Sequence, residues 1–195
     1  MSDHLFFIIA LWSFVALLVV RAYFTGVAYG QEEKISALVE GKFLWILRNI
    51  IGVFLMAIAF FYLSFPEIFH TFQIPLPIGV RVLGAFFELI GVFLYTWTHF
   101  HLGKNFTDTV VVRKGAHLVQ SGPYQYMRHP MYVSAFFIFG GGFLMTEIWL
   151  VAFFGGLLLL LILIFRTPEE ERRLVQEFGD DYLAYKKRVG IFFPK

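Results

Sequence analysis

Two short polar motifs stand at the ends of long apolar stretches of the chain. The first, residues 122–132, holds Arg128 and His129 among three tyrosines and between two prolines. The second follows the next apolar stretch and leads from Arg166 into three consecutive glutamates, 169–171. Guanidinium and imidazole groups donate hydrogen bonds, carboxylates accept them, and aromatic rings attract cations. So many charged and aromatic side chains next to apolar segments predict a binding site to which both motifs contribute.

The composition places the chain in a lipid bilayer. Of its 195 residues, 58% are hydrophobic and 15% are charged, with a mean hydropathy of +0.71, which is too apolar for a soluble domain. A net charge of +2 is too small to suggest a nucleic-acid partner, and the absence of cysteine excludes disulfides, thiolate metal sites and cysteine nucleophiles. The first apolar run lacks a basic leader and a small-residue cleavage pattern, so we expect a retained membrane helix.

The apolar segments predict five membrane crossings. Segments 5–23, 43–65 and 78–100 each reach the roughly 20 residues that a spanning helix needs. Block 131–165 is too long for one crossing and is interrupted at Thr146 and Glu147, which predicts a tight hairpin of two helices. Its glycines, 140–142 and 155–156, would let these helices approach closely, although ordinary glycine usage in membranes explains them equally well. The predicted fold is an all-α integral membrane protein with five transmembrane helices and a C-terminal amphipathic cytoplasmic helical segment.

The basic residues predict the orientation of this fold. With five crossings, every Lys and Arg except Arg81 falls on the side of loop 26–42, segment 101–128 and the C-terminal tail. The positive-inside rule makes that side cytoplasmic and leaves the N-terminus outside. Both polar motifs then share the cytoplasmic face, and the hairpin brings their helix ends together.

The tail after residue 165 is predicted to be a helix that starts anew. Thr167, Pro168 and Glu170 fit a capping box with proline at the first helical position. Apolar and aromatic residues then recur at helical spacing, and Gly179 is expected to bend or divide the helix. This stripe either packs on the protein body or the lipid interface, or covers a site; it consists of Leu174, Phe178, Tyr182 and Tyr185.

One face of segment 78–100 carries small and polar residues at three- or four-residue spacing: Gly84, Glu88, Gly91, Tyr95 and His99. Glu88 lies deep in the predicted crossing, so it should face protein, either as a protonated or hydrogen-bonded link between helices or as a functional group. His99 and His101 could suggest a metal. No Asp, Glu or Cys follows at ligand spacing, so a polar cluster at the helix end is preferred and no metal is expected.

The order of residues from Leu118 to Val189 follows a recognisable pattern. Leu118, Val119, Gly122 and Tyr124 precede Arg-His-Pro-x-Tyr at 128–132, then Arg-Thr-x-Glu-Glu-Glu at 166–171, Phe-Gly-x-x-Tyr at 178–182 and Tyr-Lys-Lys-Arg-Val at 185–189. In this order and separation, these pieces resemble the isoprenylcysteine carboxyl methyltransferase family, within an integral membrane methyltransferase superfamily that includes phospholipid N-methyltransferases. The likeness covers about the last 95 residues, with Gly103, Asn105 and Phe106 just upstream also fitting.

The resemblance implies that S-adenosylmethionine binds at the cytoplasmic face. Its sulfonium needs an anionic or aromatic surface, its carboxylate needs donors and its adenine needs a ring or an apolar shelf. Arg128 and His129 are the candidate donors, Glu170 is the candidate acceptor, and Tyr124, Tyr126 and Tyr132 are the candidate rings. The two prolines are expected to hold the backbone around His129 out of a helix and expose its amides. The implied cofactor-binding residues are Ala116, His117, Leu118, Val119, Tyr124, Arg128, His129, Pro130, Met131, Tyr132 and Glu170.

Arg166 and Glu170 are the predicted catalytic residues. An acceptor carboxylate is already deprotonated, so positioning carries the rate, and Arg166 is the candidate for gripping it in bidentate fashion. Interfacial anchoring is the competing role of Arg166. Glu170 could cap the helix in the empty enzyme and turn to the cofactor when it binds.

The predicted acceptor is a lipophilic molecule that enters from the bilayer, and a prenylcysteine or similar isoprenoid acid is favoured. A phospholipid or other lipid amine is the alternative, with Glu88 or His99 as the base. A small transporter would also place Glu88 inside the membrane, but would not explain a polar motif on one face. A sterol-type membrane reductase would need a nicotinamide motif, and none is evident.

The chain is predicted to form a single membrane domain, 1–195. Two N-terminal transmembrane helices occupy 1–65, and the catalytic core, 78–195, contains the cofactor loop 101–132, the helical hairpin 131–165 and C-terminal helices at 167–189. Membrane lipids are its expected surroundings.

Overall fold

The computed structural model describes residues 2–29, 42–105, 117–193 and 195, and these residues form a bundle of helices without a β-strand. Its long helices are α1 (Ser2–Tyr29), α2 (Lys42–Ser64), α3 (Ile78–Leu102), α4 (Pro130–Thr146), α5 (Trp149–Leu161) and α6 (Thr167–Arg188). Short helical turns lie between them: η2 (Pro66–Phe72), η3 (Gly103–Asn105), η4 (Gly122–Gln125) and the π-helix η5 (Ile162–Arg166).

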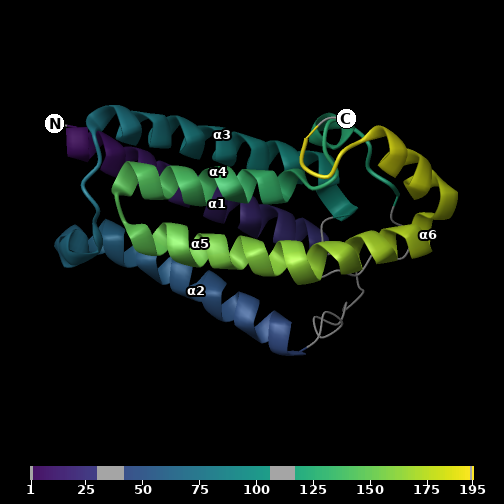
Figure 1. The fold of residues 1–195 in the computed structure, drawn as a ribbon, viewed down its shortest axis with the longest axis horizontal. Helices are drawn as coiled ribbons and strands as arrows, with labels where there is room; N and C mark the ends of the chain where they lie inside the picture. Colours follow the sequence, from purple (N-terminus) through teal and green to yellow (C-terminus); the bar gives the residue numbers. More distant parts are fainter. Residues whose placement is uncertain (1, 30–41, 106–116, 194) are drawn as a thin grey trace.

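Helices α1, α3 and α5 run in one direction and α2 and α4 run in the other (Figure 1). Four stretches are long and apolar enough to cross a membrane: Asp3–Gly26, Trp45–Ser64, Ile78–Leu102 and the apolar part of Trp149–Arg188. Helix α4 is also apolar but has 17 residues, or about 25 Å. The predicted all-helical membrane fold is therefore confirmed, while α4 as a fifth crossing stays a prediction.

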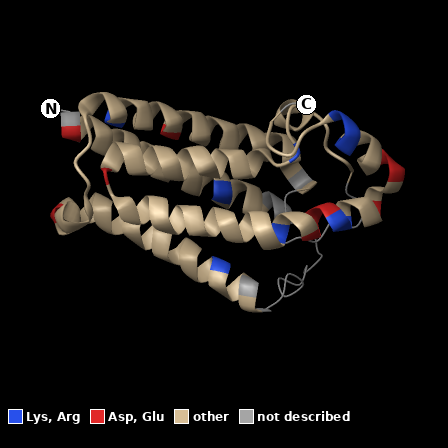
Figure 2. Ribbon diagram, viewed as in Figure 1, with Lys and Arg blue, Asp and Glu red and all other residues tan. Residues whose placement is uncertain are grey.

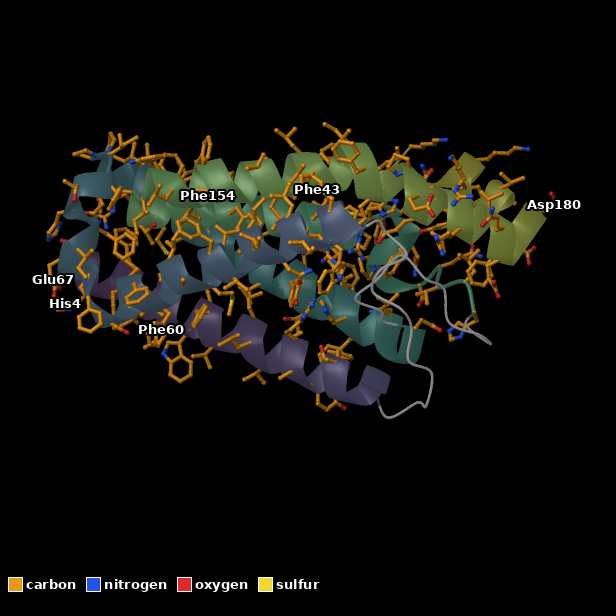
Figure 3. All side chains as sticks on the ribbon, turned by 90° about the horizontal axis from the view of Figure 1, so that it is seen from below. His4, Phe43, Phe60, Glu67, Phe154 and Asp180 are labelled. Carbon is orange, nitrogen blue, oxygen red and sulfur yellow. The ribbon has the colours of Figure 1, made fainter. Side chains whose placement is uncertain are left out.

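The charged residues divide the bundle into two unlike ends. Charged residues gather on α6, which extends beyond the bundle, while the bundle itself carries few (Figure 2). His4 and Glu67 lie at one end, and Asp180 lies at the opposite end (Figure 3). We call the end with α6 the polar end and the end with η2 the far end.

The α4–α5 connection forms the predicted tight hairpin at the far end. Glu147 adopts a left-handed backbone conformation, with φ of 68°, and α5 begins two residues later. The turn is held by the segment after η2, because Ile74 N donates to the Glu147 carbonyl (2.9 Å) and Leu76 N donates to its Oε1 atom (2.8 Å). The interruption at Thr146 and Glu147 in the sequence is thus a chain reversal that hydrogen bonds from the segment after η2 stabilise.

The glycines of the hairpin serve two different helix contacts. A Cβ atom added to Gly155 would lie 2.5 Å from Phe139 Cγ, so this glycine does allow α5 to approach α4. A Cβ atom on Gly141 would lie 2.4 Å from the backbone nitrogen of Glu88 on α3. The expectation that the glycines all serve the hairpin is therefore wrong for Gly141, which lets α4 approach α3, and for Gly140 and Gly156, where a Cβ atom would meet nothing within 4 Å.

The predicted capping box at the start of the tail is wrong. Helix α5 continues through the π-helix into α6, and Arg166 already has helical angles, φ −82° and ψ −46°, where an N-cap residue would not. Thr167 Oγ1 donates to the Ile162 carbonyl (3.1 Å) instead of accepting from an amide. We attribute the continuity to the wider π-turn, which relieves the clash and the missing N–H that Pro168 brings to an α-helix.

Gly179 bends α6, as predicted. Its φ of 53° and ψ of −127° are not helical, and the second half of α6 turns back toward the bundle (Figure 1). Tyr182 and Tyr185 are buried there and pack with Val189 against Leu118, Leu174, Val175 and Phe178. The aromatic stripe therefore packs on the protein body, as one of its two interpretations predicts, and its four residues also line an internal cavity, as the other requires.

Candidate active site

A cavity of about 840 Å³ runs through the bundle from the polar end toward the α4–α5 turn. This volume lies within the range of small-molecule sites. The predicted site residues that line it are His117, Leu118, Val119, Tyr124, Arg128, His129, Pro130, Met131, Tyr132, Arg166 and Glu170. Ala116 lies outside the described residues.

Glu170 is the centre of a cluster that joins the two polar motifs. Its Oε2 atom accepts a hydrogen bond from the Tyr132 hydroxyl (2.5 Å), and its Oε1 atom accepts one from Arg166 Nε (2.8 Å). His129 Nδ1 lies 3.6 Å from Oε2, and the His129 ring stacks on Tyr132 with centroids 5.2 Å apart and planes 3° from parallel. The fold thus brings a carboxylate, a guanidinium and two stacked rings to the wall of the cavity.

Arg128 has partners that the sequence did not predict. Its Nε donates to Glu171 Oε1 (2.8 Å), and its Nη1 donates to the carbonyls of Val189 (2.7 Å) and Lys186 (3.2 Å). The side chain is 4% exposed. Arg128 therefore clamps both halves of α6 to the first motif, and these contacts favour a positioning role over a donor to cofactor.

The Arg128 clamp keeps Glu171 ionised. Burial raises the pKa of Glu171, but hydrogen bonds from His129 and Lys186, together with the Arg128 guanidinium, lower it to about 2. This carboxylate lies on α6 beyond the apolar part of the α5–α6 helix, which ends at Phe165. A charged carboxylate with cationic partners is a stable anchor for the turned-back half of α6.

The backbone around His129 also pairs with the C-terminal segment. Arg128 N donates to the Gly190 carbonyl (2.9 Å), and His129 N donates to the Ile191 carbonyl (3.1 Å). The expectation that the two prolines leave these amides for a ligand is therefore wrong at both positions. Pro130 instead starts α4, where its missing N–H costs nothing.

The turn at the start of the first motif is packed against the end of α3. Gly122 has φ of +60°, and a Cβ atom there would lie 2.3 Å from His101 Cδ2. His101 thus has a packing role beside the site. Next in the turn, the Tyr124 carbonyl accepts a hydrogen bond from the Tyr185 hydroxyl (2.7 Å), whose pKa burial raises to about 12. Tyr126 is exposed and does not line the cavity, so the prediction that its ring serves the cofactor is wrong.

The cavity also includes residues that were not predicted site residues. Asn105, which belongs to the family pattern, has its Nδ2 atom 3.3 Å from Nε2 of the predicted cofactor-binding residue His117, and both residues line the polar end. Arg21 of α1 and Arg48 of α2 line it as well. The only signal for these two arginines in the sequence is a basic residue inside an apolar stretch, which indicates topology.

The fold and the cavity define a multi-pass helical membrane protein with a large internal site that is polar at one end. The model of the isoprenylcysteine carboxyl methyltransferase (ICMT) family matches residues 83–176, which contain α4, α5, most of α3 and the start of α6. Over these residues, just under half of its length, the chain is similar to this family.

A solved structure shares the fold. It is that of the eukaryotic intramembrane Ras methyltransferase ICMT, with a TM-score of 0.54, 20% sequence identity and coverage of 91% of this chain. The match covers 62% of that protein, so the chain lacks a counterpart to much of its length. No curated protein matches the chain significantly.

Proposed function

We propose that the chain transfers a methyl group from S-adenosylmethionine to a lipophilic acceptor, with carboxyl O-methylation of a prenylcysteine or similar isoprenoid acid as the favoured reaction. The observation that carries this proposal is that the Glu170 cluster and a long apolar chamber belong to the same cavity. The match of the ICMT family model to residues 83–176 supports the choice of reaction. One cavity would thus bind both the polar reacting group and the apolar tail of the acceptor.

The residues at the polar end suit S-adenosylmethionine. This cofactor supplies a methyl group on a cationic sulfur. Glu170 offers a carboxylate, the stacked His129 and Tyr132 offer aromatic surface, and Leu118 and Val119 offer an apolar shelf. We assign cofactor binding to these residues and to His117, Tyr124, Pro130 and Met131, and assign it to Ala116 on the family resemblance alone.

Arg166 is the proposed ligand of the acceptor carboxylate. It lines the cavity where the π-helix joins α6, and its bond to Glu170 fixes the side chain before any acceptor arrives. A guanidinium held in this way orients a carboxylate with little loss of freedom. No base is needed, because the carboxylate is already ionised at neutral pH.

We propose that the acceptor enters from the bilayer between α1 and α2. Leu18 of α1 and Val53 and Met56 of α2 all line the cavity, yet they are 40%, 69% and 43% exposed. The cavity therefore reaches the surface of the helices that face lipid. Helix α1 packs mainly on α3 and α2 mainly on α5, which leaves room between the two for a lipid tail.

The proposed topology has five crossings, with the N-terminus outside and the polar end in the cytoplasm. The alternating direction of α1 to α5 supports it (Figure 1). Arg81 is the exception to the charge asymmetry, and it is compensated at the far end by Asp3 (2.7 Å) and Glu147 (3.6 Å). Its position is thus compatible with the outer side of the membrane.

Titration of purified protein with S-adenosylmethionine tests the donor. We expect saturable binding in the wild type that is lost in His129→Ala and Glu170→Ala and kept in Glu177→Ala, an exposed glutamate of α6. No binding to folded wild-type protein would refute the methyltransferase assignment.

A labelled methyl group tests the acceptor. After transfer to prenylcysteine analogues or membrane lipids, a methyl ester releases volatile methanol in mild base, whereas a methylated amine does not. Release of methanol is the expected result, and a base-stable product would favour lipid N-methylation.

A further inference from the structure

A buried carboxyl group lies deep in the cavity and has no part in the proposed reaction. Glu88 of α3 is 6% exposed and lines the cavity, and its Oε2 atom has no hydrogen-bond partner among the described residues. It does not form the predicted link between helices through this atom. The lining residues that α4 contributes around it are apolar: Ile138, Phe139 and Met145.

An unpaired polar atom in such surroundings is costly and rare in native proteins. The ionised form would cost several times more, so the group is neutral and carries a proton that it can donate. Gly142 lies opposite the carboxyl on α4: a Cβ atom there would lie 3.4 Å from Oε2. Glu88 and Gly142 both line the cavity, so the carboxyl group lies at the cavity wall.

The distance from the Glu170 cluster suits the tail of a bound lipid. Tyr132, which bonds to Glu170, and Gly142, which contacts Glu88, are ten residues apart on α4. At the rise of an α-helix, this separation is about 15 Å. A lipid whose polar group lies at Arg166 would pass its extended tail along this part of the cavity.

We propose that Glu88 is a specificity-determining residue that donates a hydrogen bond to an oxygen atom in the tail of the lipid acceptor, about 15 Å from the methylated group. The favoured acceptor is then a lipophilic acid whose tail carries a hydroxyl, ether or carbonyl oxygen, and a pure hydrocarbon tail binds less well. The inference rests on the proposed function, because it assumes that the polar group of the lipid lies at Arg166.

Equilibrium binding without methyl donor tests the inference. The probes are N-acetyl-S-farnesylcysteine and the same molecule with a hydroxyl on its terminal isoprene unit, offered to protein in lipid nanodiscs. The wild type is expected to bind the hydroxylated probe about tenfold more tightly. Glu88→Leu should abolish this preference, and Glu88→Gln, which keeps a donor, should retain part of it. Glu67→Leu, an exposed glutamate of η2, is the matched control.

A second pair of variants examines the same group without changing it. Gly142→Ala should reduce the preference by placing a methyl group before the carboxyl, whereas Gly140→Ala, where a Cβ atom would meet nothing within 4 Å, should not. Equal affinity of both probes for the wild type, or a preference that survives in Glu88→Leu, would overturn the inference.

Methyl transfer to the same two probes, measured separately, distinguishes the two proposals. Methyl transfer to both probes, together with equal affinities of the protein for them, would support the proposed function and contradict the role of Glu88. Failure of both probes to bind would overturn the role of Glu88, and the titration with S-adenosylmethionine would then decide the methyltransferase assignment by itself.

Discussion

The Tyr132 hydroxyl donates a 2.5 Å hydrogen bond to Glu170 Oε2, across 38 residues of sequence. Tyr132 belongs to the first polar motif at the start of α4, and Glu170 belongs to the second at the start of α6. The hairpin of α4 and α5 carries the chain away from the polar end and back, so that these two groups meet. The bond therefore shows directly that the two motifs form one site.

Tyr132→Phe tests whether this bond prepares Glu170 for the cofactor. The ring and its stacking on His129 remain, but Glu170 loses a donor and gains freedom. We expect the affinity for S-adenosylmethionine to fall about tenfold, as for one lost hydrogen bond to a charged group. Isothermal titration measures the change, with Tyr126→Phe, outside the cavity, as the control. Unchanged affinity would mean that the bond serves the fold alone.

Arg166→Lys separates charge from geometry. Lysine keeps the positive charge but cannot form the planar fork that orients a carboxylate. We expect KM for a prenylcysteine analogue to rise about tenfold to a hundredfold, with a smaller change in the binding of methyl donor. Steady-state kinetics at saturating donor measure KM, and Arg172→Lys, on the exposed face of α6, is the control. A lowered donor affinity with unchanged KM would assign Arg166 to the cofactor.

The elements of this fold that follow from local pattern could be predicted, and those that depend on tertiary contacts could not. The apolar segments and the interruption at Glu147 predict the helices and the hairpin. The capping box at Thr167 is a local pattern as well, but Glu170 bonds to Tyr132 and Arg166 instead, and the π-turn lets the helix continue. Arg128 could not be assigned because most of its partners are backbone carbonyls.

Arg128→Ala should destabilise the protein more than any surface substitution. It leaves the buried Glu171 carboxylate without its guanidinium and the Val189 carbonyl without a donor, at a cost of about 3–5 kcal/mol. Thermal unfolding in detergent measures the loss, and Arg172→Ala should change little because its ion pair is exposed. A small effect of Arg128→Ala would show that α6 is held by its tyrosines alone.

The same ion pair predicts a dependence of stability on pH. The pKa of Glu171 is lowered from 4.5 to about 2 in the folded state. A carboxyl group with a lowered pKa contributes stability above its unfolded pKa and loses it as pH falls through the folded value. We therefore expect the melting temperature to fall between pH 5 and 2, and less steeply in Glu171→Gln. Equal slopes in the two proteins would contradict this origin.

Gly122 and Gly179 provide a matched test of strain against crowding. Both have positive φ, +60° and +53°, so alanine is strained at either position by about 1–3 kcal/mol. At Gly122 the methyl group would also meet the His101 ring, whereas at Gly179 it would meet nothing within 4 Å. Gly122→Ala should therefore lower the melting temperature more and also weaken donor binding. Equal effects would show that the His101 ring moves aside without cost.

A bulky residue at the opening between α1 and α2 tests the path of the acceptor. Val53 lines the cavity and is 69% exposed, so Val53→Trp places a large ring where a lipid tail would pass. The tryptophan ring is apolar enough to be stable at a surface that faces lipid. Access to the site would narrow, so KM for a prenylated acceptor is expected to rise severalfold, whereas donor binding at the polar end should not change. Val82→Trp is the control, because Val82 is also exposed on a membrane helix, α3, but does not line the cavity. If Val53→Trp and Val82→Trp give the same KM, the acceptor does not pass between α1 and α2, and the openings nearest the polar end become the route to test next.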